Sequence, residues 1–142
     1  MAAKSATFDN DFLKLIFNAT TMTGMARNDT SPVTDLYVSL HTASPGTSGN
    51  QTTNEIAYGG YARQPVVRTS SGWTVTANSV SPAAQIDFPI GISGSGTATY
   101  FAVGTDITGT GKVLYFGTVT PNIVCGTGVT PSLTTATAIT EA

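Results

Sequence analysis

The feature that most constrains the fold is a series of short alternating segments from residue 33 to the C-terminus. In "LYVSLH" (36–41), apolar residues alternate with others at the two-residue period of a β-strand. Clusters of Gly, Pro, Ser and Asn separate each such segment from the next. The further segments are YARQPVVRT (61–69), WTVTA (73–77), NSVSPAAQIDFP (78–89), TATYFAVG (97–104) and KVLYFGTV (112–119), with one or two more in 123–140.

About eight short strands with turn signals between them are typical of an antiparallel sandwich or a small barrel. Helical segments do not alternate with the strands, which argues against a parallel α/β fold. Only 10% of the residues are charged and 40% are hydrophobic, a balance opposite to that of a disordered chain. The sequence therefore predicts a mainly β protein: an antiparallel β-sandwich or jelly-roll-like barrel with one short N-terminal helix.

That helix is predicted in "FDNDFLKLIFNAT" (8–20), where Asp9 or Asn10 can cap its start. A helix this short and apolar is not stable alone in water, so it must pack on its own chain or on a neighbouring subunit. It either covers one open end of the sandwich or docks on another copy. The apolar face expected to lie in an intersubunit contact comprises Phe8, Phe12, Leu15 and Ile16.

The chain divides into an N-terminal helix with its linking loop (1–32) and one β-sandwich domain (33–142). The formal net charge is −2, and the six basic residues are scattered, which argues against nucleic acid as a partner. No apolar run reaches the roughly 18 residues of a membrane span, and no secretory signal is visible. We therefore expect a protein that is made in the cytoplasm and does not bind membranes.

His41, the only histidine, either belongs to an active site or ends a strand and bonds to loop backbone. No surrounding sequence resembles a known nucleophile motif, so we expect no enzyme, catalytic residue or cofactor. One histidine and the single Cys125 do not make a metal site, and Cys125 is expected to be a small buried apolar residue. The glycine-rich segments 91–96 and 108–112 are better explained as turns before strands than as phosphate loops.

Three aromatic residues, Trp73, Tyr58 and Tyr61, are candidates for a sugar-binding surface. Aromatic residues that alternate with branched neighbours in strands more often belong to the core, however. Arg63 is expected to pair with Glu55 or Asp87 in a structural role.

"LYVSLHTASPGTSGNQTTNEIAYGGYARQPVVR" (36–68), followed by "GWTV" and "GKVLYFG", resembles a family of tailed-bacteriophage virion proteins. The resemblance spans nearly the whole chain. Members are described as head decoration (cement) proteins or as tail-fibre proteins, so the resemblance implies a structural virion component without catalytic residues.

From this resemblance we expect a capsid decoration protein on the capsid surface. We expect the chain to form a homo-oligomer, specifically a trimer. Its partner would be the phage major capsid protein, and binding only to the assembled shell would stabilise that shell by mass action. The alternative is a tail-fibre or receptor- and glycan-binding module of the phage tail, with Trp73 or the tyrosines exposed.

Overall fold

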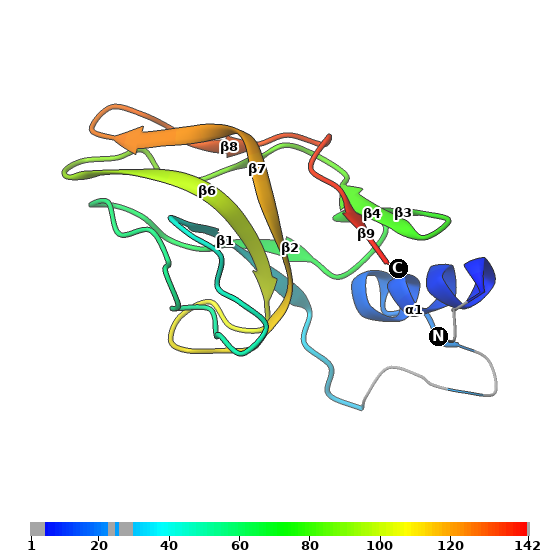
Figure 1. The fold of residues 1–142 in the computed structure, drawn as a ribbon. Helices are drawn as coiled ribbons and strands as arrows, with labels where there is room; N and C mark the ends of the chain where they lie inside the picture. Colours follow the sequence, from blue (N-terminus) through cyan, green and yellow to red (C-terminus); the bar gives the residue numbers. More distant parts are fainter. Residues whose placement is uncertain (1–4, 23–24, 26–29, 142) are drawn as a thin grey trace.

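The computed structural model describes residues 5–22, 25 and 30–141. The two ends of the described chain lie near each other at one end of the molecule, beside helix α1 (Ala6–Asn18) (Figure 1). Most of the described chain after residue 33 is strand and turn, so the predicted mainly β fold with one N-terminal helix is confirmed. Part of the predicted linking loop, residues 23–24 and 26–29, lies outside the described residues.

Within the described residues, nine strands form three antiparallel sheets that are arranged like a sandwich and do not close into a barrel. The four-stranded sheet has the order β2 (Gln64–Val67), β1 (Asp35–His41), β6 (Ser95–Gly104), β7 (Val113–Gly126). The three-stranded sheet has the order β3 (Trp73–Thr76), β4 (Ser79–Pro82), β9 (Ile139–Thr140), and the last pair is β5 (Ile86–Asp87) with β8 (Ser132–Leu133). Pro65 lies in β2 at the edge of its sheet, where a residue without an N–H is tolerated.

The alternation in β1 places three apolar side chains, Leu36, Val38 and Leu40, in the core between the sheets, and each is at most 2% exposed. Helix α1 packs against β3 and contributes Leu13 and Phe17 to the same core. The Phe17 and Trp73 rings meet edge to face with centroids 4.9 Å apart. The helix therefore covers one end of its own sandwich, which was one of the two alternatives.

The start of α1 differs from the prediction. The helix begins at Ala6 because Ser5 is the N-cap, and its hydroxyl accepts a hydrogen bond from the Phe8 amide at 3.2 Å. Asp9, one of the predicted caps, instead lies in the first turn, where a carboxylate interacts favourably with the helix dipole. At the other end, Arg68 donates to the carbonyl oxygens of Leu15 and Ile16, which ties the last turn to the sheet.

Strand β7 is longer than the predicted segment 112–119 and includes part of the next segment. Between the pairs Tyr100–Thr118 and Ala98–Ile123, β6 has one residue and β7 has the four residues 119–122. This bulge lets one strand continue through Pro121, which has no amide to donate to a ladder. The break in the apolar pattern at Pro121 predicts two separate strands, whereas the structure has one continuous strand, β7.

Candidate functional site: a buried polar network and an open groove

His41 is the last residue of β1 and its side chain is completely buried. Nδ1 lies 2.9 Å from the Thr53 carbonyl oxygen, which can only accept, so Nδ1 carries the proton. Nε2 therefore accepts from the Ser39 hydroxyl, also at 2.9 Å. The interpretation of His41 as a strand-end residue bonded to loop backbone is confirmed.

The burial of His41 was not visible in the sequence. Segment 53–56 runs antiparallel beside the end of β1, where Glu55 forms a bridge with His41 and the Ile56 amide donates to the Leu40 carbonyl oxygen. Burial lowers the pKa of His41 below its ordinary value of 6.5, and the bond to the Thr53 carbonyl opposes this only in part. At neutral pH the ring is therefore uncharged. Ser39 is also completely buried, so no substrate reaches this serine–histidine pair.

Arg63 and Glu55 form a two-pronged ion pair at the centre of the network. Nε and Nη2 of Arg63 each lie 2.7 Å from a different oxygen of the Glu55 carboxylate, which is the strongest geometry for such a pair. The Tyr61 hydroxyl donates to the same carboxylate at 2.9 Å and accepts from the Leu40 amide. Of the two predicted partners of Arg63, the structure selects Glu55.

The same guanidinium holds the loop that connects β6 to β7. Arg63 donates to the carbonyl oxygens of Asp106 at 2.9 Å and Gly109 at 2.8 Å. The fully buried Gln51 completes the attachment, because its amide both donates to the Asp106 carbonyl and accepts from the Asp106 N–H. The hydrogen bonds of His41, Arg63 and Gln51 thus hold two loops, 42–54 and 105–111, against the sheet.

Asp87, the other predicted partner of Arg63, lies on the surface. Its carboxylate accepts hydrogen bonds from Ser132 and Gln85, which lower its pKa. Within the described part of the chain, no group of three or more His, Cys, Asp or Glu side chains could hold a metal ion. Cys125 is completely buried, as predicted.

The aromatic residues considered for sugar binding are mostly core residues. Trp73 is 1% exposed and Tyr58 is 3% exposed, and Tyr61 is partly buried against the core. The prediction that Trp73 or these tyrosines line an open binding surface is therefore wrong for Trp73 and Tyr58. Of the two glycine-rich segments, 108–112 lies in the connection between β6 and β7, as predicted. Segment 91–96 is not a turn: Gly91 and Ser93 form bridges with Thr127 and Gly59, and 95–96 already belong to β6.

The helix presents two apolar stripes. Leu13 and Phe17 face the core, with Ile16 packed beside them. Three of the four residues expected at an intersubunit contact form the second stripe: Phe8 is exposed, Phe12 and Leu15 are half-buried, and the Phe8 and Phe12 rings stack. The helix thus uses one stripe within the chain, and Phe8 of the other stripe is exposed.

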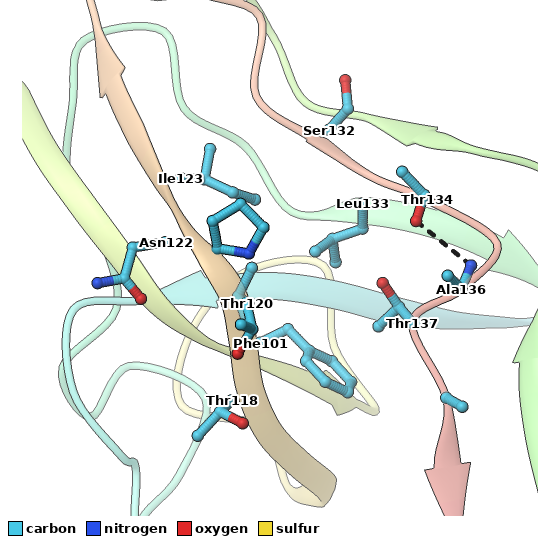
Figure 2. Close-up of a pocket in the computed structure, with 13 residues that line it drawn as sticks. Phe101, Thr118, Thr120, Asn122, Ile123, Ser132, Leu133, Thr134, Ala136 and Thr137 are labelled. Atoms are coloured by element: carbon cyan, nitrogen blue, oxygen red, sulfur yellow. Dashed lines mark hydrogen bonds between the residues drawn. The ribbon is translucent and has the colours of Figure 1, made fainter.

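A groove of about 670 Å³ lies between β7 and the segment 132–138 (Figure 2). Ile123 of β7 and Leu133 of β8 lie on opposite walls, and Phe101 of β6 lies near its lower end in the view. The remaining wall residues are Thr, Ser, Ala, Val, Pro and Asn, so the groove contains no charged side chain. No sequence pattern indicates this groove, because its walls come from segments that are distant along the chain.

Comparison with known proteins supplies the family. A sequence model described as "Podophage GP4 fiber I protein gp80" matches residues 3–139. No curated protein matches the chain. No helix in the described ranges is long and apolar enough to cross a membrane. Because the match covers almost the whole chain and agrees with the resemblance of its motifs, the protein belongs to the podophage GP4 fiber I protein family and is a structural component of a tailed-phage particle.

Proposed function

We propose that the chain is a subunit of a fibre on the phage tail. The observation that carries this proposal is the match of residues 3–139 to a family described as a fibre protein. The structure supports it, because the polar network around His41 is occupied by internal hydrogen bonds and serves the scaffold. Apolar surfaces, in contrast, remain open on α1 and β7. The chain functions by binding other protein subunits and performs no catalysis.

Capsid decoration is the second candidate, and the low charge of the chain favours it. Eight acidic and six basic residues among 142 give a surface with little charge to desolvate against another protein. In this role the partner is the major capsid protein, and binding at many equivalent positions of the assembled shell stabilises it. The fibre assignment ranks first because the description of the family names a fibre.

Both candidates use the second stripe of α1 in a contact between subunits of a homo-oligomer, which we propose to be a trimer. Because α1 also contributes residues to the core, the choice of variant decides whether this contact can be tested. Deleting residues 1–20 would also remove Leu13 and Phe17 from the core, so loss of folding would hide any loss of assembly. Substituting Phe8, which is 39% exposed, by Lys changes the stripe and leaves the core intact.

Immunogold labelling of intact particles with an antibody to this chain separates the two candidates. Gold at the tail supports the fibre proposal. Gold distributed over the head overturns it and supports decoration. A second measurement, binding of the purified chain to empty capsid shells, is expected to be negative for a tail fibre and saturable for a decoration protein.

A further inference from the structure

We propose that β7 is the strand along which a second copy of this chain docks. The first observation is the burial of its side chains. Only one of its fourteen residues, Cys125, is buried, whereas five of the seven residues of β1 are buried. Yet β7 begins with the consecutive apolar residues "VLYF" (113–116), a pattern typical of a strand covered on both faces.

The second observation is the free edge of the strand. β7 is the last strand of the four-stranded sheet and pairs only with β6. Among the described residues, the backbone groups of 113–125 make no hydrogen bond to any other segment. Natural sheets protect such an edge with charged residues, Pro or bulges. Here the bulge at 119–122 protects its middle, and the strand itself contains no charged residue, although the Glu141 carboxylate accepts a hydrogen bond from the Tyr115 hydroxyl in its first half at 2.7 Å.

The lack of charged residues in and around β7 indicates which partner binds there. The 28 residues from Val113 to Thr140 contain no Asp, Glu, Lys or Arg, and they include β7 and the far wall of the groove. A partner rich in charge would lose hydration here without gaining an opposite charge. A second copy presents the same 28 residues without a charged side chain, so its docking desolvates little charge, and its own β7 supplies the matching free backbone groups.

The other edge of this sheet is a poorer partner. β2 has four residues against fourteen in β7, and it contains Pro65, which has no N–H to donate. Its neighbours in sequence include Arg63 and Arg68, whose guanidinium groups are engaged elsewhere in the chain. The long uncharged edge of β7 is therefore the better site for joining copies.

This inference rests on the proposed role of the chain as an assembling subunit, and two residues provide its test. Val124 in β7 is 69% exposed in the single chain, so Val124→Lys places a charge on the docking strand without disturbing the core. Ile107 lies in the β6–β7 connection, away from β7, and is 53% exposed. Ile107→Lys is the matched control, with the same apolar-to-Lys change. Thr118→Lys, also exposed on β7, is the second variant.

The molar mass of each purified chain is measured by size-exclusion chromatography with light scattering, and folding is checked by circular dichroism. Pairing of two β7 strands is a two-fold contact, separate from the contact proposed for α1. We therefore expect Ile107→Lys to have the oligomeric mass of the wild type, and Val124→Lys and Thr118→Lys to be folded and to have a lower mass at the same concentration. Hydrogen exchange is expected to be slow at the β7 amides of the wild type and fast in the two β7 variants. A monomeric wild type, or β7 variants with the mass and exchange of the wild type, overturns the inference. Gold labelling of the head would overturn the tail-fibre role and leave this result unaffected.

Discussion

The ion pair between Arg63 and Glu55 gives the sharpest test of what the motif residues do. The Arg63 side chain is 4% exposed and that of Glu55 is 15% exposed, so the pair lies largely out of water. Arg63→Met removes the cation, while the Tyr61 hydroxyl still donates to the Glu55 carboxylate. Breaking a buried pair by removing one partner costs about 3–5 kcal/mol. We expect the free energy of unfolding to fall by that amount.

Thermal and urea unfolding followed by circular dichroism measure this loss. Each kcal/mol lowers the Tm of a domain of this size by roughly 3–4 °C, so Arg63→Met is expected to melt about 10–20 °C below the wild type. Lys112→Met is the control, because Lys112 is exposed in the β6–β7 connection and surface changes usually stay within about 0.5 kcal/mol.

A double-mutant cycle then isolates the pair from the bonds that Arg63 makes to loop 105–111. Glu55→Gln alone leaves the Arg63 cation largely buried without its counter-charge. Combining both substitutions removes both charges, so the double variant is expected to lose less than the sum of the single losses. The reasoning is refuted if Arg63→Met loses less than about 1 kcal/mol, or if the two losses simply add.

Three further predictions concern burial elsewhere. Phe17→Ala is expected to cost about 3–5 kcal/mol in urea unfolding because Phe17 is fully buried, whereas Phe8→Ala on the second stripe costs less than about 1 kcal/mol; equal losses would contradict the two-stripe description of α1. Because burial lowers the pKa of His41, the unfolded chain binds a proton at higher pH than the folded chain does. The stability from this residue is therefore complete above pH 6.5 and is lost as the pH falls below it; His41→Gln should flatten the pH dependence of urea unfolding in that range, and an unchanged slope would count against it. Gly104→Ala is expected to cost about 1–3 kcal/mol, because its Cβ would overlap the buried Gln51 amide, whereas Gly126→Ala, with no atom closer than 3.6 Å, should melt within a few degrees of the wild type.

The virion family could be recognised from the sequence because its motif residues are consecutive or closely spaced. The structure gives these motifs a physical role: His41, Glu55 and Arg63 come from separate segments, yet one hydrogen-bonded network holds them. The sequence suggested Glu55 or Asp87 for Arg63, and only the fold decided between them. Spacing along the chain does not measure distance in space, and Asp87 lies on the surface beside Ser132.

The sequence by itself determined the fold class, since alternating apolar residues and turn-forming residues act locally and need no knowledge of neighbouring strands. It also located most strands and the helix. Burial, pairing order and edges depend on contacts between distant residues, and only the tertiary structure decided them. It buried His41 and paired it with segment 53–56, turned Leu13 and Phe17 of the helix inward, and left β7 at an open edge. The open surfaces proposed here for assembly are therefore a property of the packed chain, because a side chain is left exposed only by how all the other segments pack around it.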